Sequence, residues 1–256
     1  MNNEVSDGPG RRRVALVSNS SLYLGPDLAR VLAARGHDLV LGDPADGLVD
    51  ELEAAGTAVE VVKDCLDLAD PESSRRLIGA GLDRFGQIDS ATMFSGVIVV
   101  GSFLDSSRDN LRSAIRGALE APYNFLREVV PPMVEQGAGQ VLVVTSSTGA
   151  RPTIGAPLYS AARAGANHLV RNVAAEVASS GVQVNALGTN FMDFPEFRRA
   201  TGADNPEIRA KIEEQVPMGR LGTMQECAEL CAAFVDGACG FMSGQFVGVD
   251  GAWTWA

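Results

Sequence analysis

Short apolar runs alternate with amphipathic segments along nearly the whole chain, and this alternation limits the possible folds more than any other feature. Residues 13–18 (RVALVS) have the continuous apolar character of a strand that is buried on both faces. The next segment has Leu28, Val31 and Leu32 at helical spacing and ends at Gly36. Strands that alternate with helices throughout a chain predict a parallel sheet with helices on both faces.

The same alternation continues to the end of the chain. Further strands are predicted at residues 38–42, 58–62, 140–145, 182–187 and 245–249, and an apolar segment covers residues 88–100. Helices are predicted at residues 47–55, 71–85, 108–136, 206–215 and 225–236, and another begins near Pro157. The pattern predicts an α/β fold with a doubly wound, Rossmann-like parallel sheet of about seven strands. We expect a single domain at residues 13–256 after a flexible tail at residues 1–12.

The charge and the hydropathy of the chain limit its partners. The formal net charge of −11 argues against a nucleic-acid partner, because phosphate binding needs a basic surface. No stretch of roughly 18 or more apolar residues appears, so no contact with a membrane is predicted. The first 13 residues lack the apolar core of a secretory signal. We therefore expect a cytoplasmic protein.

The four cysteines do not predict a disulfide framework in a chain of 256 residues. Cys227 and Cys231 are four residues apart on a predicted helix, but no histidine lies near them in the sequence to complete a metal site. We therefore predict buried thiols and no metal.

Three side chains suggest a catalytic site. Ser146 directly follows the strand predicted at residues 140–145, so we expect its hydroxyl at the carboxyl end of the sheet, where open α/β folds bind their ligands. Tyr159 and Arg163 are four residues apart, so they share one face of a helix that begins near Pro157. A positive charge beside a phenol stabilises the phenolate, which can act as a base. The pairing predicts an activated tyrosine.

The turn after the first strand lacks the glycines of a dinucleotide site. Such sites have three glycines here, and in residues 18–25 (SNSSLYLG) only Gly25 remains. We expect Tyr23 to project a bulky ring into the space that the phosphates of a nicotinamide cofactor need. Asp43, after the second strand, favours a cofactor, since an acid there can bind an NAD ribose, but a solvated loop carboxylate explains it equally well. The missing glycines weigh more, so we predict no cofactor.

The spacing of the candidate site residues supports a family resemblance. With a serine thirteen residues before a tyrosine and a basic residue four after it, the chain resembles the short-chain dehydrogenase/reductase superfamily. Dehydrogenases of that superfamily have lysine where this chain has Arg163. Serine, tyrosine and arginine at this spacing are similar to the halohydrin dehalogenases, which keep the fold without the cofactor. The first-turn pattern of that family is matched by Ser18, Tyr23 and Gly25, with Ser18 in place of a threonine, and the resemblance extends over residues 13–251.

The resemblance implies a function and a set of site residues. It implies a lyase that converts vicinal haloalcohols to epoxides and halide, and that in reverse opens epoxides with azide, cyanide or nitrite. Tyr159 would remove the hydroxyl proton while Ser146 binds the same oxygen, and Thr148 would line the substrate site. Residues 188–192 look like the halide-binding turn of the family, in which a proline is common at the position of Thr189. The halide site implied in this way consists of Tyr23, Thr189, Asn190, Phe191 and Met192.

Two other functions remain open from the sequence. The chain can be an NAD(P)-dependent short-chain reductase with an atypical cofactor turn, which Asp43 favours and which Tyr23 and Arg163 oppose. It can also be a superfamily member without catalytic activity. The resemblance implies a homo-oligomer, a tetramer, although the apolar helix faces are explained equally well by contact with the sheet. Trp253 and Trp255 either pack on a neighbouring subunit or cover the edge of the sheet.

Overall fold

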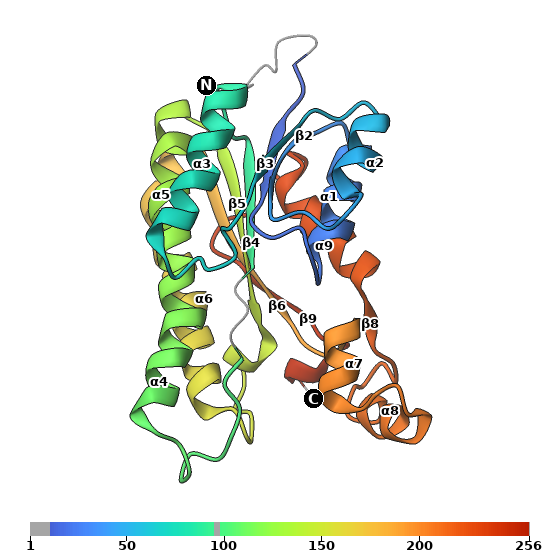
Figure 1. Cartoon of the computed structure of the whole chain (residues 1–256). Coiled ribbons are helices and arrows are strands. Elements are labelled where there is room, and N and C mark those ends of the chain that lie inside the picture. The colour runs from blue at the N-terminus through green and yellow to red at the C-terminus, as the bar shows by residue number, and fades with distance from the viewer. Residues whose placement is uncertain (1–10, 95–97, 256) are drawn as a thin grey trace.

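The computed structural model describes residues 11–94 and 98–255, and its centre is a parallel sheet covered by helices on both faces (Figure 1). The sheet has seven strands in the order β3-β2-β1-β4-β5-β6-β9, and every neighbouring pair is parallel. This is the doubly wound sheet that the sequence predicts. Its strands are β1 (Val14–Val17), β2 (Asp38–Gly42), β3 (Val59–Val62), β4 (Ser90–Phe94), β5 (Gly139–Ser146), β6 (Val182–Thr189) and β9 (Phe246–Val249).

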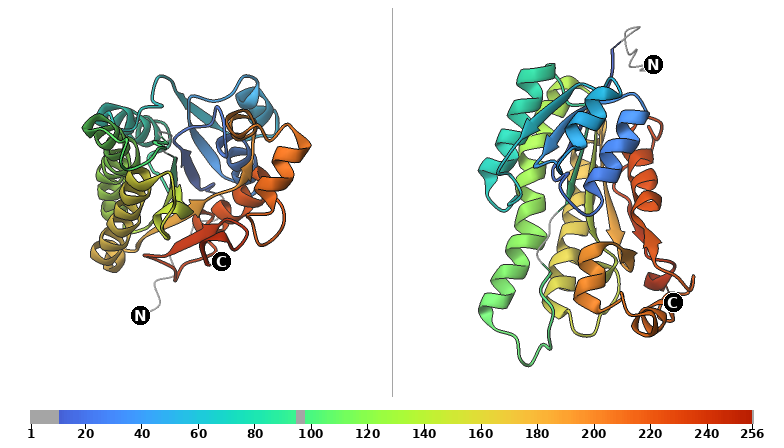
Figure 2. Two further views of the ribbon diagram at one scale, coloured as in Figure 1. Left: turned by 90° about the horizontal axis from the view of Figure 1, so that it is seen from below. Right: turned by 45° about the vertical axis from the view of Figure 1, so that its right-hand side comes forward.

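Helices cover the two faces of the sheet in separate layers (Figure 2). One layer consists of α1 (Gly25–Ala34), α2 (Leu48–Ala54) and α9 (Met224–Val235). The other consists of α3 (Pro71–Phe85), α4 (Arg108–Ile115), α5 (Ala121–Gln136) and α6 (Pro157–Val177), with a π-helical turn (Arg116–Glu120) between α4 and α5. No helix in the described ranges is both long enough and apolar enough to cross a bilayer.

Each face of the sheet has its own apolar core, because successive side chains of a strand point to opposite faces. Leu16 and Val143 pack with residues of α3, α5 and α6. Their neighbours Val17 and Val144 pack with residues of α1 and α9 instead. The strands are therefore mostly apolar, as expected for a sheet that is buried on both sides.

Several predicted helix boundaries agree with the structure. The helix predicted at residues 71–85 is α3, and α6 begins at Pro157 as expected. Of the apolar segment at residues 88–100 only β4 forms a strand; residues 95–97 lie outside the described residues, and Ile98 is exposed. Most of the predicted tail also lies outside the described residues, so its boundary stays a prediction.

The chain between β6 and α9 contains elements that the sequence analysis does not predict. They are α7 (Pro195–Thr201) and a two-stranded sheet of β7 (Met192–Asp193) and β8 (Gly222–Thr223). Strands of two residues are too short to show an alternation, which explains why the sequence gives no signal for them.

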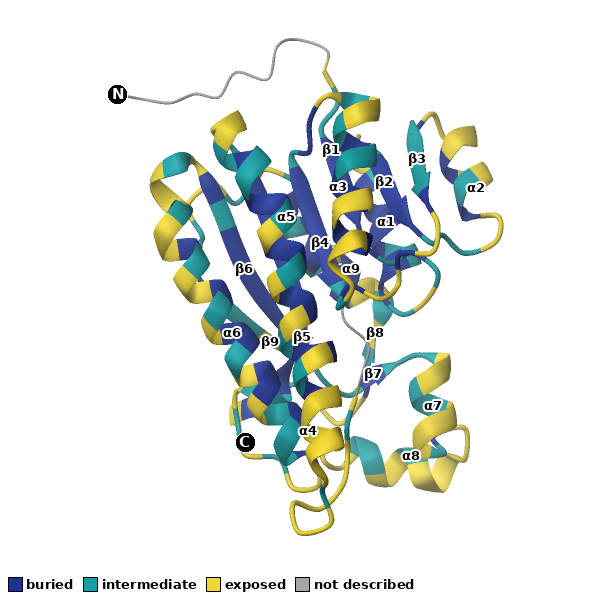
Figure 3. Cartoon of the chain, turned by 60° about the vertical axis from the view of Figure 1, so that its left-hand side comes forward, coloured by how far each residue is buried: buried dark blue, intermediate teal, exposed yellow. Residues whose placement is uncertain are grey.

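Residues 194–213, which contain α7 and α8 (Pro206–Glu213), form a unit that we name the cap. The cap lies beside the carboxyl end of the sheet, away from the two helix layers (Figure 1). Neither helix of the cap has a buried residue, whereas the strands of the central sheet are mostly buried (Figure 3).

Candidate active site

Ser146 and Thr189 meet at the carboxyl end of the sheet. They are the last residues of β5 and β6 and pair directly across the two strands. The Ser146 hydroxyl donates to the Thr189 carbonyl oxygen at 3.3 Å, and it accepts bonds from the Thr148 amide at 3.2 Å and the Thr148 hydroxyl at 3.0 Å. Because the bond to Thr189 is the longest of the three, it is the one that a substrate oxygen would replace most easily.

Tyr159 and Arg163 lie on the same face of α6 and are both buried, as the sequence predicts. The side chain of Arg163 is only 2% exposed, and its guanidinium carbon lies 5.1 Å from the centre of the Tyr159 ring. Ala114 and Ala118 belong to the same apolar cluster as Tyr159. A cation at this distance from an aromatic ring is attracted by it, so the pair is stable in a site with little water.

Two glycines allow the turn after Ser146 to pack between α6 and β6. A Cβ at Gly149 would lie 2.8 Å from the carbonyl carbon of Arg163, and a Cβ at Gly188 would lie 2.9 Å from the Ser147 nitrogen. Contacts this short exclude any larger residue unless the backbone shifts. The serine end of the site is therefore fixed directly against the backbone of the helix that holds Tyr159.

Tyr23 joins the first turn to the end of β6. Its phenol donates to the Thr189 hydroxyl oxygen at 2.8 Å. Its ring packs edge-on against Phe94, with ring centres 6.4 Å apart, and against Phe194 at 4.7 Å. Because β4 and β5 separate β1 from β6 in the sheet, the Tyr23 side chain extends across the carboxyl edge of the sheet.

The environment of Tyr23 keeps its phenol neutral. Burial raises the pKa of Tyr23 well above its ordinary value, and the nearby Cys227 raises it further. The hydrogen bond to Thr189 offsets only part of this increase. A neutral phenol can donate a hydrogen bond, which is the role that Tyr23 has toward Thr189.

The residues of the first turn do not fit the pyrophosphate of a dinucleotide. In doubly wound folds the dinucleotide crosses the carboxyl edge at the point where the strand order reverses, and small residues let it approach the backbone. In this chain β1 and β4 meet at that point, and the Tyr23 side chain extends over it. Gly25, the one glycine that remains, serves packing: a Cβ there would lie 1.9 Å from the Asn19 carbonyl oxygen.

Asp43 has a role that the sequence analysis does not foresee. Its carboxylate accepts one bond from the Asp64 amide at 2.7 Å and another from the Cys65 amide at 2.9 Å. These bonds fix the turn after β3. The Asp43 carboxylate thus connects two turns, although the residue remains partly exposed.

The structure divides the five predicted halide residues into two groups. Tyr23 and Thr189 are in direct contact through their hydroxyls. Asn190, Phe191 and Met192 instead line a cavity of about 150 Å³ whose other walls include Val216, Met218 and Val249.

Two backbone groups of the predicted halide turn already have partners. The Asn190 amide donates to the Val249 carbonyl at 3.2 Å, and the Phe191 amide donates to the Asn190 side-chain oxygen at 3.0 Å. Phe191 has a left-handed backbone with φ of +53°, and Met192 pairs with Gly222 in the small sheet. A halide at this turn would therefore have to displace the Asn190 side chain from the Phe191 amide.

Aromatic contacts around the site are the main feature that sequence reasoning does not find. Trp253 packs against Phe191 with ring centres 5.6 Å apart, and the guanidinium carbon of Arg151 lies 4.6 Å from the Trp253 ring. Arg151 also donates to the Trp253 carbonyl oxygen. Trp253 thus packs within its own chain, whereas Trp255 is 85% exposed. The contact of Phe194 with Tyr23 is not predicted either. The sequence offers one indication of it, the three-residue spacing of aromatic residues from Phe191 onward.

Comparison with known proteins shows that the chain is similar to oxidoreductases. The sequence profile of the family described as Enoyl-(Acyl carrier protein) reductase matches residues 20–254. Oxidoreductase UcpA of Salmonella typhimurium is 29% identical over 252 residues, which cover 94% of each chain. A cis-4-hydroxycyclohexanecarboxylate dehydrogenase of Sinomonas cyclohexanicum is 30% identical over 250 residues, with 94% of this chain and 96% of the dehydrogenase covered.

Solved structures give the same result. A gluconate 5-dehydrogenase from Burkholderia cenocepacia, crystallised in complex with NADP and tartrate, has a TM-score of 0.85 and 25% sequence identity. The match covers 95% of this chain and 96% of that chain. The broader of the two resemblances in the sequence is confirmed, since the profile covers most of the chain: this protein belongs to the short-chain dehydrogenase/reductase superfamily.

Proposed function

We propose that this protein is a halohydrin dehalogenase that converts vicinal haloalcohols to epoxides and halide without a cofactor. The proposal depends most on Tyr23, whose side chain extends over the edge of the sheet where dinucleotides bind in this type of fold and whose phenol bonds Thr189. Arg163 supports it as well, because the superfamily's dehydrogenases have a lysine there. Ser146 and Tyr159 supply the hydrogen-bonding groups that the reaction needs.

The reaction starts with a proton transfer to Tyr159. As a phenolate beside the Arg163 guanidinium, Tyr159 removes the proton from the substrate hydroxyl. Ser146 turns its hydroxyl from the Thr189 carbonyl to the same oxygen and holds it near the neighbouring carbon. The alkoxide electron pair forms the new carbon–oxygen bond of the epoxide while the carbon–halogen bond breaks and the halide leaves with its electron pair.

The leaving halide needs donors that are already oriented. We place it near Tyr23 and Thr189 on one side and the turn of Asn190, Phe191 and Met192 on the other. Tyr23 stays neutral, so it donates a hydrogen bond to an anion without repelling it. In the reverse reaction azide, cyanide or nitrite would enter the same place and Tyr159 would return the proton to the epoxide oxygen.

An NAD(P)-dependent dehydrogenase or reductase is the second candidate. The curated relatives favour it, since they are named as oxidoreductases and dehydrogenases, and the structural relative was crystallised with NADP. Ser146 and Tyr159 suit a hydride-transfer site equally well. The first turn opposes it through Tyr23, and Asp43 no longer distinguishes the two functions because its carboxylate binds the backbone.

Two measurements on the wild-type protein separate these candidates. The first is halide release from a simple vicinal chloro- or bromohydrin without added nicotinamide. The second is titration with NADPH and NADH, followed by fluorescence and by hydride transfer to ketones. We expect halide release and no saturable binding of either nucleotide. Saturable binding with hydride transfer, and no halide release, would replace the dehalogenase with the reductase.

We also propose, on the resemblance alone, that the protein is a homotetramer. Light scattering during size-exclusion chromatography measures this directly, and a mass of one or two chains would exclude it.

A further inference from the structure

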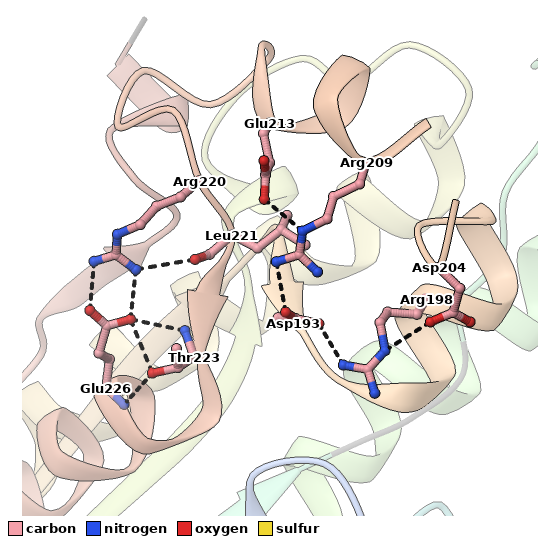
Figure 4. Close-up of polar contacts among 9 residues, drawn as sticks. All are labelled: Asp193, Arg198, Asp204, Arg209, Glu213, Arg220, Leu221, Thr223 and Glu226. Carbon is pink, nitrogen blue, oxygen red and sulfur yellow. Dashed lines mark hydrogen bonds and ion pairs between the residues drawn. The ribbon is translucent and has the colours of Figure 1, made fainter. Parts of the chain in front are cut away.

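An ion-pair cluster connects the cap to the predicted halide turn (Figure 4). Its centre is Asp193, which follows Met192 directly and ends β7. Arg198 of α7 donates to one carboxylate oxygen of Asp193 at 2.7 Å, and Arg209 of α8 donates to the other at 2.8 Å. Each helix of the cap is therefore bound to the same residue by a separate charge-assisted hydrogen bond.

The two arginines are oriented further by acids of the cap itself. Arg209 also donates to Glu213 at 2.9 Å, and Arg198 lies 3.2 Å from Asp204. Isolated surface ion pairs contribute little to stability, but a shared carboxylate with several fixed donors limits the freedom of all its members. Asp193 is the less exposed partner in both ion pairs: 23% of its side chain is accessible, against 33% for Arg198 and 33% for Arg209.

Asp193 lies in the sequence between Met192 and Phe194, and both of these neighbours contact the region of the site. Met192 on one side belongs to the predicted halide turn. Phe194 on the other side packs against Tyr23, with ring centres 4.7 Å apart, and against Phe197 of α7 at 6.0 Å. The backbone at residues 192–194 therefore transmits the position of the cap to both walls of the site.

Burial holds the cap only weakly, since α7 and α8 have no buried residue and the buried Ala203 between them has a small side chain. The Phe194 contact and the Asp193 bonds attach the cap to the site. Burial alone would raise the pKa of Asp193, but the bonds from Arg209 and Arg198 hold it below its ordinary value, so the carboxylate stays charged near neutral pH.

We propose that Asp193 is a positioning residue that latches the cap onto the active site and thereby fixes Phe194 against Tyr23 and Met192 in the halide turn. This inference rests on the proposed function for its effect on turnover, although the latch itself does not. Release of the latch loosens the site walls that bind substrate and halide, while the base on α6 keeps its place.

The test compares Asp193→Asn with a matched control, Arg199→Gln. Arg199 lies on the same helix as Arg198 but, among the described residues, it pairs only within that helix, with Glu196. Hydrogen exchange measured by mass spectrometry on the full chain should rise about tenfold in peptides from residues 194–215 of Asp193→Asn and stay unchanged in β1 and β5. Arg199→Gln should leave all these regions as in the wild type.

Kinetics give the second readout. We expect Asp193→Asn to raise KM for the halohydrin about tenfold with a smaller change in kcat, and Asp193→Glu to restore part of the loss. Unchanged exchange in the cap, or equal losses in Asp193→Asn and Arg199→Gln, would overturn the latch. If Asp193→Asn does not fold, Arg198→Gln and Arg209→Gln are measured in its place with the same expectations. If the wild type releases no halide, the proposed function fails, and the exchange data still decide on the latch.

Discussion

The two sides of the site are held by different forces. On the side of β5 and α6, Tyr159 and Arg163 are buried and Gly149 packs directly on the backbone of α6. On the side of the cap, the helices have no buried residue and Asp193 forms ion pairs with them. Close packing resists displacement because any shift creates a clash or a cavity, whereas partly exposed ion pairs open at a lower cost. The rigid side that holds Tyr159 thus faces a side of the site that can move.

The proposed base, Tyr159, gives the largest expected effect. In the proposed mechanism Tyr159→Phe removes the phenol oxygen that takes the proton, so it should lower kcat for halide release at least about 100-fold, the usual range for a lost general base. Tyr123→Phe is the matched control, because Tyr123 is 53% exposed on α5. If Tyr159→Phe keeps an activity within threefold of the wild type, Tyr159 is not the base.

The second largest effect is expected on stability, from the packing between α6 and the turn after Ser146. Gly149→Ala forces a Cβ to within 2.8 Å of the Arg163 carbonyl carbon, so we expect the free energy of unfolding to fall by about 1–3 kcal/mol. Gly79→Ala is the control, since an added Cβ in this part of α3 meets no atom within 4 Å. That variant should be more stable by roughly 0.5–1 kcal/mol, because alanine loses less backbone entropy. Urea unfolding measures both, and equal stabilities would show that the turn adapts.

Tyr23 links the two sides, so its phenol tests how far they depend on each other. Tyr23→Phe keeps the ring contacts with Phe94 and Phe194 but leaves the Thr189 hydroxyl without this donor. We expect a loss of roughly 0.5–1.5 kcal/mol in stability, together with weaker inhibition by bromide. If bromide inhibits Tyr23→Phe as strongly as the wild type, the Tyr23 hydroxyl does not contribute to halide binding.

The pH dependence of stability gives the smallest effect and separates the core from the cap. His37 is buried, and burial followed by the charge of Arg13 lowers its pKa, so the folded protein holds it neutral. The unfolded chain binds a proton near the ordinary value of 6.5, so stability is complete above pH 6.5 and decreases as the pH falls below it. The Asp193 carboxylate has a lowered pKa, so its contribution persists until the pH falls through its ordinary range near 3.8.

Between pH 7 and pH 5, therefore, global stability should decrease while the cap stays docked. Urea unfolding and hydrogen exchange of residues 194–215, corrected for the intrinsic pH effect, measure the two quantities. His37→Gln should flatten the slope of stability against pH. A cap that undocks between pH 7 and pH 5 would contradict the assignment of its attachment to Asp193.

Local sequence determines the sheet, most of the helices and the placement of Ser146, Tyr159 and Arg163. Apolar runs must be buried and helical spacing puts residues four apart on one face, so these features need no knowledge of distant contacts. The absence of glycines at residues 18–24 is equally local. The narrower family resemblance depends on the same few positions and is still a proposal.

Tertiary structure alone decides what the remaining residues touch. Tyr23 contacts Thr189 across 166 residues of chain, and Asp43 accepts hydrogen bonds from the amides after β3. No local pattern in the sequence predicts that Asp193 binds arginines from two helices. Such contacts depend on strand order and on the path of the loops, because side chains from distant segments meet only when the sheet brings its carboxyl ends together. The sequence by itself therefore determined the pairing of Tyr159 with Arg163 and the lack of a glycine-rich turn, and the fold decided which residues lie opposite them.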